Sequence, residues 1–144
     1  MDIHPAAIER LNRLCAIEQY SLPNYLLHIR PWSRQRDQLT GATLRRIAAE
    51  QQSFGERAGS MIALRHGAVN PGNFPFRFTS FHGVSFDSLA HQLVVEQEQV
   101  VDDVSRLALA FDEDPEVQAL VEETLGSEKR HLENLRKLTA RIPI

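Results

Sequence analysis

Four glutamates and one histidine are spaced in a way that could bind metal. Glu18 and Glu50 are 32 residues apart, and the same interval separates Glu96 from Glu128. His131 follows Glu128 by three residues, which on a helix places both side chains on one face, as chelation of one ion requires. Buried carboxylates are costly unless a positive charge meets them, and a helical bundle with one inward glutamate per helix can hold a pair of metal ions. The spacing therefore predicts a carboxylate-bridged metal site.

Each glutamate lies in a stretch with the apolar spacing of an amphipathic helix. Apolar residues recur there at intervals of three and four, and the glutamate falls on the same stripe. Asp114-Pro115-Glu116 is a start signal, with an N-cap acid, a proline in the first turn and an acid near the positive end of the helix dipole. We expect four helices, over about residues 5–30, 42–66, 85–111 and 115–143.

Three local features of these helices lead to further predictions. Pro23 lies inside the first helix and should kink or locally rearrange the chain near Gln19. Gly67 follows the second helix where a C′ glycine would. Gly55 and Gly59, four residues apart, should leave a smooth patch where another backbone could approach closely.

The segment between the two halves of the chain, residues 67–85, is long and aromatic. Residues 74–86 hold five of the seven phenylalanines. A connection this long needs a role in a compact domain. It could cross over along the length of the bundle, or it could pack its aromatic side chains against a neighbouring subunit. We expect self-association, because clustered phenylalanines are seldom left exposed by a monomer; the residues concerned are Phe74, Phe76, Phe78 and Phe81.

Connection lengths predict the fold class. Short connections within each half and one long connection between the halves favour two antiparallel helical hairpins joined by a crossover. A chain of 144 residues is most simply one domain, so we expect a single all-α domain over residues 1–144.

Composition excludes several classes of function. The formal net charge is −3 and no long run of either sign occurs, which argues against a nucleic-acid platform. The single cysteine, Cys15, fits a reducing compartment. The sequence has no signal-peptide pattern and no stretch near the ~18 apolar residues of a membrane span. We therefore expect a cytoplasmic protein that binds neither nucleic acid nor membrane.

The assignment of the third glutamate has an alternative. Glu98 competes with Glu96, because Val94, Val101 and Ser105 could place it on a secondary face. Glu96 is preferred, since its neighbours three, four, seven and eight residues away are leucine or valine.

Beyond these patterns, the chain resembles the ferritin-like superfamily of bacterioferritin and rubrerythrin. In the first helix, Glu18 is followed by Tyr25 at +7 and His28 at +10, as around the first iron-ligating glutamate of bacterioferritin. The second helix carries Glu50, the crossover has a similar length, and the fourth helix carries the Glu-x-x-His that begins at Glu128. The resemblance extends over nearly the whole chain and implies a ferritin-like antiparallel four-helix bundle.

The chain departs from the family pattern at three places. Ser53 stands where the family has its second-helix histidine. Gln51 stands where bacterioferritin has the methionine that ligates haem, so no haem is expected. The sequence ends at Ile144, without the short fifth helix that such cages use in assembly, so a dimer or small homo-oligomer is expected.

The resemblance implies ligands for two metal ions. Glu50 and Glu128 would bridge the ions, and Glu18 and Glu96 would be terminal ligands. His131 would complete one ion's shell, whereas the other ion would have no nitrogen donor and would bind weakly. This ligand set suits iron, manganese or zinc.

With iron, the implied chemistry is iron oxidation or the reduction of dioxygen or peroxide, as in a ferroxidase or another oxidoreductase. Tyr25, one heptad beyond Glu18, could supply an electron, or it could be a core tyrosine with a satisfied hydroxyl. Whether the protein is an enzyme stays open at this point.

A second hypothesis comes from a different class of protein. The chain could be a metal-poor helical bundle that acts as an oligomeric partner-binding protein through its aromatic crossover. Its glutamates would then pair with each other or with arginines, for which Arg45, Arg46 and Arg57 are candidates. Without metal or protons, four buried carboxylates would be hard to tolerate, because like charges raise one another's pKa.

Overall fold

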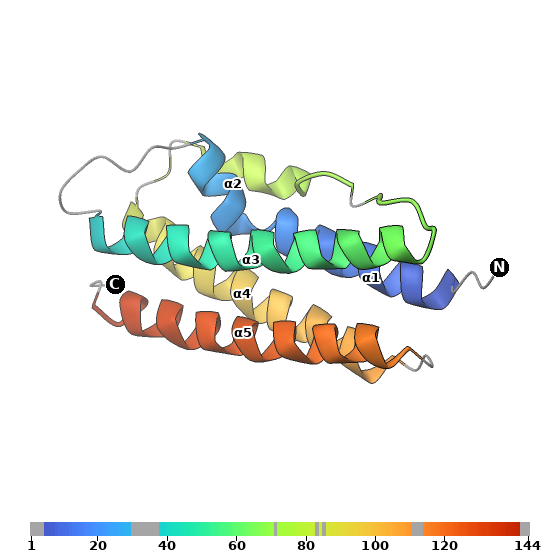
Figure 1. Ribbon diagram of the computed structural model, residues 1–144. Helices are drawn as coiled ribbons and strands as arrows, with labels where there is room; N and C mark the ends of the chain where they lie inside the picture. The colour runs from blue at the N-terminus through green and yellow to red at the C-terminus, as the bar shows by residue number, and fades with distance from the viewer. Residues whose placement is uncertain are drawn as a thin grey trace.

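The computed structural model describes residues 5–29, 38–70, 72–82, 84, 86–110 and 114–141, with the side chains of 38–40 and 86–87 left out. Every regular element within these residues is helical, which confirms the all-α prediction (Figure 1). The elements are α1 (Pro5–Gln19), α2 (Leu22–Ile29), α3 (Gln38–Leu64), the 3₁₀ helix η2 (Phe76–Phe81), α4 (Phe86–Leu109) and α5 (Pro115–Thr139).

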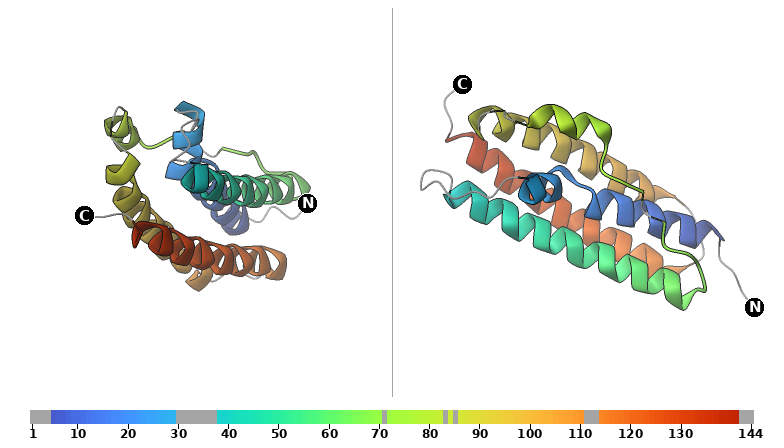
Figure 2. Two further views of the ribbon diagram at one scale, coloured as in Figure 1. Left: turned by 90° about the vertical axis from the view of Figure 1, so that its left-hand side faces the viewer. Right: turned by 90° about the horizontal axis from the view of Figure 1, so that it is seen from above.

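The long helices pack as two pairs. α1 lies along α3 and α4 lies along α5, and the two pairs face each other across the core (Figures 1 and 2). The core divides into two clusters of buried apolar side chains, one around Leu11, Leu14 and Val121 and the other around Leu26, Ile47 and Leu89. None of the described helices is long and apolar enough to cross a bilayer.

The predicted first helix is broken in two at the expected place. α1 ends at Gln19 and α2 begins at Leu22, with Pro23 in the first turn of α2. Because proline lacks an amide hydrogen, it is tolerated at the start of a helix but not in its interior. The Ser21 hydroxyl accepts a hydrogen bond from the main-chain N–H of Asn24 at 3.4 Å, as an N-cap residue does. The rearrangement near Gln19 is thus confirmed, as a complete restart of the helix.

The end of α3 differs from the prediction by one residue. His66, and not Gly67, has the left-handed conformation, with φ of 60°. The Gly67 amide donates to the Ile62 carbonyl at 3.0 Å, which closes the helix as a C″ residue does. Gly67 matters for a different reason: a Cβ there would lie 2.9 Å from the Cδ1 atom of Ile8 on α1. The prediction of Gly67 as the C′ residue was therefore wrong, because His66 occupies that position. Gly67 is needed instead because a side chain there would clash with Ile8.

Close packing is confirmed at one of the two glycines of α3. A Cβ at Gly55 would lie 2.4 Å from Cγ of Gln19, and the Gly55 carbonyl accepts a hydrogen bond from the Cys15 thiol at 3.3 Å. At Gly59 the nearest atom would be 3.9 Å away, so this glycine has room for a side chain. α1 thus approaches α3 closely through Gly55.

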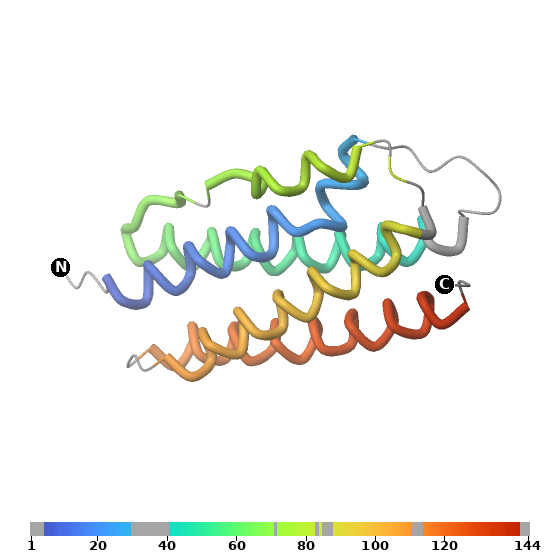
Figure 3. The backbone as a smooth tube through the Cα atoms, turned by 180° about the vertical axis from the view of Figure 1, so that it is seen from behind, coloured from blue at the N-terminus to red at the C-terminus, as the bar shows by residue number. Residues whose placement is uncertain are grey.

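The crossover between the halves runs along the molecule (Figure 3), and most of its aromatic side chains pack inward. Phe78 is buried, and Phe74 and Phe81 pack against the same cluster. Tyr25 on α2 meets the edge of the Phe74 ring at a centroid distance of 5.2 Å. Only Phe76 among the four phenylalanines predicted to drive self-association is largely exposed, at 87%. Packing within the chain therefore accounts for most of this segment's aromatic character.

Candidate functional site

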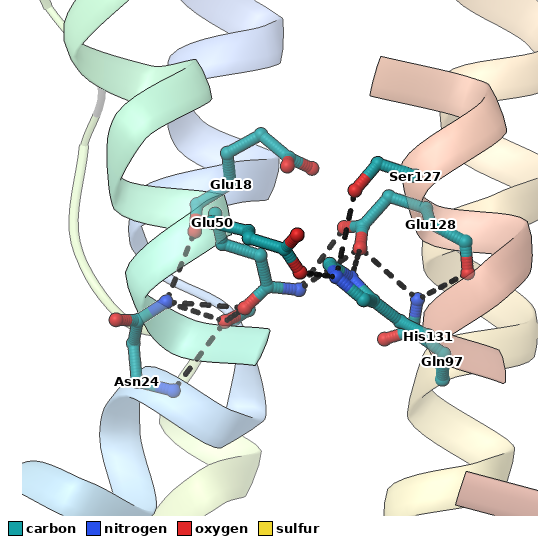
Figure 4. Close-up of polar contacts among 9 residues, drawn as sticks. Glu18, Asn24, Glu50, Gln97, Ser127, Glu128 and His131 are labelled. Carbon is teal, nitrogen blue, oxygen red and sulfur yellow. Dashed lines mark hydrogen bonds and ion pairs between the residues drawn. The ribbon is translucent and has the colours of Figure 1, made fainter. Parts of the chain in front are cut away.

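Three of the predicted glutamates and the histidine come together between the two helix pairs. Glu18 comes from α1, Glu50 from α3, and Glu128 and His131 from α5 (Figure 4). His131 contacts a carboxylate with each ring nitrogen: Nε2 lies 2.6 Å from Oε2 of Glu50, and Nδ1 is hydrogen-bonded to Oε1 of Glu128. The three-residue spacing on α5 brings these last two side chains together, as predicted. We call Glu18, Glu50, Glu128 and His131 the acidic cluster.

Glu18 is fully buried, and the polar group beside it is the carboxyl group of Glu128. Within the described part of the chain, neither of its carboxyl oxygens has a hydrogen-bond partner. Burial raises the pKa of Glu18 well above its usual value, and the neighbouring Glu128 raises it further. Burial and the Glu128 carboxylate thus both favour the neutral acid form of Glu18.

Glu128 is buried to the same degree but is surrounded by donors. Gln51 Nε2 donates to its two oxygens at 3.0 and 3.3 Å, and Gln97 Nε2 lies 3.3 Å from Oε1. Burial opposes ionisation of Glu128, but hydrogen bonds, above all the one from His131, outweigh it and lower the pKa. Glu128 is therefore held as a carboxylate beside the neutral Glu18.

His131 supplies the positive charge of the acidic cluster. Burial lowers its pKa, but the carboxylates of Glu128 and Glu50 raise it by more, so the net shift is upward. A carboxylate beside each ring nitrogen favours the imidazolium form, in which both nitrogens donate a hydrogen bond. Its charge is shared between a fully buried carboxylate and Glu50, whose side chain is 49% exposed. One imidazolium and the proton on Glu18 thus reduce the net charge of the acidic cluster to about −1, because the Glu50 and Glu128 carboxylates share one positive charge.

The break between α1 and α2 positions the amide that supports Glu128. The Ser21 hydroxyl donates to Oε1 of Gln51 at 2.5 Å, and Asn24 Nδ2 donates to the same oxygen at 3.2 Å. These contacts fix the orientation of the Gln51 amide, so that its nitrogen faces Glu128. Pro23 and Ser21 therefore contribute to the cluster by restarting the helix at this level.

α4 contributes an amide to the cluster and not a glutamate. Glu96 is turned to Arg77 of η2, with Nη2–Oε1 at 2.7 Å and Nε–Oε2 at 3.0 Å. The alternative, Glu98, contacts Arg136 at 3.1 Å. Gln97 lies between them, is 1% exposed, and donates from Nε2 to the Glu128 carbonyl at 3.0 Å.

Gln51 and Gln97 are the contacting residues that sequence reasoning missed. Gln51 was considered only as the replacement for a haem ligand. A signal for Gln97 did exist, because it lies four residues after Leu93 and seven before Val104 on the buried stripe of α4. Glu96, the neighbouring residue, was predicted as the ligand instead because a carboxylate is a common metal ligand.

The remaining predicted residues lie outside these contacts. The Tyr25 hydroxyl is hydrogen-bonded to Nε2 of His82, and its ring packs against phenylalanines, which is the geometry of a core tyrosine. A role for Tyr25 as an electron donor stays a prediction. Ser53 is exposed. Of the arginines proposed as counter-ions, Arg57 pairs with Glu123 at 2.7 Å, and Arg45 and Arg46 are exposed.

The donor set fits a metal ion in type, but it is not arranged around one position. Within the described residues, no three His, Cys, Asp or Glu side chains surround a common point. Both ring nitrogens of His131 are directed at carboxylates, so a ligand role requires one of them to lose its hydrogen and turn to the ion. The Glu18 carboxyl lies beside Glu128 and accepts no hydrogen bond from a donor among the described residues, so it could bind an ion without giving up such a bond. Carboxylates and imidazole together suit iron, manganese or zinc.

No family model matches the chain, and no curated protein or solved structure is significantly similar to it. The ferritin-like resemblance therefore rests on the residues that carry it.

Proposed function

We propose that this protein is a ferritin-like helical bundle that binds a divalent transition-metal ion through Glu18, Glu128 and His131, with Glu50 as a further ligand. The observation that carries the proposal is the Glu18 carboxyl, which is fully buried with neither oxygen hydrogen-bonded in the described part of the chain. Burying such a group without a partner is costly, so its presence needs a compensating role. A cation bound beside Glu18 and Glu128 would supply the missing partner.

The proposal is for one tight ion. α4 offers the Gln97 amide where a second ion would need a carboxylate, because Glu96 is held by Arg77. The resemblance implies two unequal positions, and these contacts support the unequal reading. A second ion would have to bind weakly near Glu50, whose side chain is half exposed.

The protein's own residues would manage the charge when an ion binds. Glu18 would release its proton, and His131 would release one as its ring turns from imidazolium to neutral ligand, since metal ligands must be deprotonated. Gln51 and Gln97 would hold Glu128 in place throughout. An iron ion would supply electrons for the reduction of dioxygen or peroxide.

A titration of metal-free protein with Mn(II), Zn(II) and anaerobic Fe(II), followed by calorimetry, tests this proposal. Glu18→Gln should weaken the tight site by at least about tenfold, as expected for an outright ligand. Glu96→Gln is the matched control on α4 and should leave the affinity unchanged. Equal losses in the two variants would restore the assignment of Glu96 as a ligand. Absence of binding to the unmodified protein would refute the proposal.

A second candidate function is favoured by the imidazolium of His131, which already offsets one of the cluster's carboxylate charges without metal. On this reading the protein is a metal-poor oligomeric bundle that binds partners through the crossover, where Phe76 is the exposed aromatic residue. Elemental analysis of the purified protein separates the two, because near-zero transition metal favours the second. Sedimentation of Phe76→Ser beside the unmodified protein tests the self-association.

A further inference from the structure

A pocket opens beside the acidic cluster, where the α1–α2 break, the crossover and α4 meet. Its volume is about 260 Å³, just below the roughly 300 Å³ at which pockets for small ligands usually begin. Space of this size suits a ligand of about one ring. Ser21 and Gln97 form part of its wall, and each also reaches inward, Gln97 to Glu128 and Ser21 to Gln51.

The ionisable residues of the pocket wall carry a net negative charge. Among the described residues of the wall, Arg77 is the one guanidinium, against the carboxylates of Glu96 and Asp103. Both carboxylate oxygens of Glu96 accept hydrogen bonds from Arg77, from Nη2 at 2.7 Å and from Nε at 3.0 Å. Asp103 accepts a hydrogen bond from the neutral Gln99 amide at 2.8 Å; Arg77 attracts it at longer range, but Asp103 has no ion pair within 4.0 Å among the described residues. Asp103 is thus the charge that a ligand could meet.

The rest of the wall is apolar and aromatic. Ile17, Val100 and Pro75 contribute aliphatic surface, and Tyr20 and Phe78 contribute rings. The Arg77 guanidinium lies over the Phe78 ring at 5.1 Å, so this wall already accommodates a cation against an aromatic face. A ligand with an apolar body and a positive end could pack its body against this wall and place its charge near Asp103.

We propose that this pocket binds a small organic amine in its protonated form, with the ammonium at Asp103 and the apolar body between α1 and α4. An anion is disfavoured, because it would have to displace Glu96 from Arg77 and approach Asp103. A neutral ligand of the same shape would fill the pocket but would form no ion pair with Asp103. The proposal concerns a site separate from the metal site, and it holds whether or not metal binds.

Three probes of one shape test the proposal: benzylamine, benzyl alcohol and benzoate, which carry charges of +1, 0 and −1. Each is titrated into the metal-free full chain at pH 7, and binding is followed by the NMR shifts of the Ile17 and Val100 methyl groups. Because an exposed charge pair contributes little, benzylamine should bind about two- to fivefold more tightly than the alcohol, and benzoate most weakly.

Two matched variants locate the charge. Asp103→Asn should reduce benzylamine affinity to that of the alcohol and leave the alcohol unchanged; asparagine keeps the acceptor for Gln99. Asp102→Asn, one residue away and paired with Arg106 at 2.8 Å, should change neither affinity. Equal affinities for all three probes, a preference for benzoate, or shifts without saturation would each overturn the proposal. So would a benzylamine affinity that Asp103→Asn leaves unchanged.

Discussion

Glu18 and Glu96 are glutamates on predicted apolar stripes, and the molecule treats them in opposite ways. Glu96 is met by the arginine of η2 at the edge of α4, where water still reaches the guanidinium. Glu18 lies inside, with no arginine partner among the described residues, and its raised pKa favours the protonated form beside the ionised Glu128. The comparison teaches that a carboxylate on a helix stripe becomes either a surface ion pair or a chemically unusual group, according to whether a long cationic side chain can reach it.

The largest effect should come from removing the interior cation. His131→Ala leaves Glu128 buried with its main counter-charge gone, and breaking a buried pair in this way costs about 3–5 kcal/mol. Urea unfolding at pH 7 of metal-free protein measures it. Glu128→Gln added to the same variant should recover part of the loss, because the unpaired charge is then absent. A cost below about 1 kcal/mol would show that the pair behaves like a surface one.

The next effect concerns the pH dependence of stability. The folded-state pKa of Glu18 is raised, so the unfolded chain ionises first and the free energy of unfolding falls as the pH rises above the usual glutamate pKa. The raised pKa of His131 acts in the same direction, since its stabilisation is lost as the pH rises through its folded-state pKa. Glu18→Gln should therefore stabilise metal-free protein at pH 8 and have little effect at pH 4. Equal effects at the two pH values would mean that Glu18 is ionised in the fold.

The smallest effect is expected at the surface pair. Arg77→Ala should cost less than about 1 kcal/mol, and the cost should shrink further in 1 M salt, because exposed ion pairs are weak and screened. The metal affinity should not change. Thermal melts at two salt concentrations, together with the metal titration, check both points. A loss of metal affinity in this variant would connect Glu96 to the site after all.

The sequence was sufficient for the features that depend on local pattern. Apolar spacing and the N-cap at Asp114 located the helices, and Pro23 located the break. Three of the four glutamates converge because their stripes face the core. The rest depended on contacts between side chains far apart in the sequence. Arg77 of the crossover pairs with Glu96, Gln19 packs on Gly55 of α3, and Ile8 packs on Gly67 after the end of α3. Such pairings carry no periodic signal.

Chemical type also misdirected the prediction on α4. A glutamate drew attention as a ligand, whereas the side chain that touches Glu128 is the neutral Gln97. The same holds for Gln51 on α3. In an interior position an amide donates to a carboxylate without adding a charge, so a neutral residue on a buried stripe can be as informative as an acidic one.

The central claim is that Glu18 keeps its proton until a cation replaces it, and this can be observed directly. The carboxyl carbon of Glu18, assigned with the help of Glu18→Gln, reports ionisation through its NMR shift in protein labelled with ¹³C. At pH 7 the metal-free protein should show a protonated Glu18, and saturating Zn(II) should convert it to the carboxylate. If Glu18 is already ionised without metal, or stays protonated when Zn(II) is bound, the account of this site is contradicted.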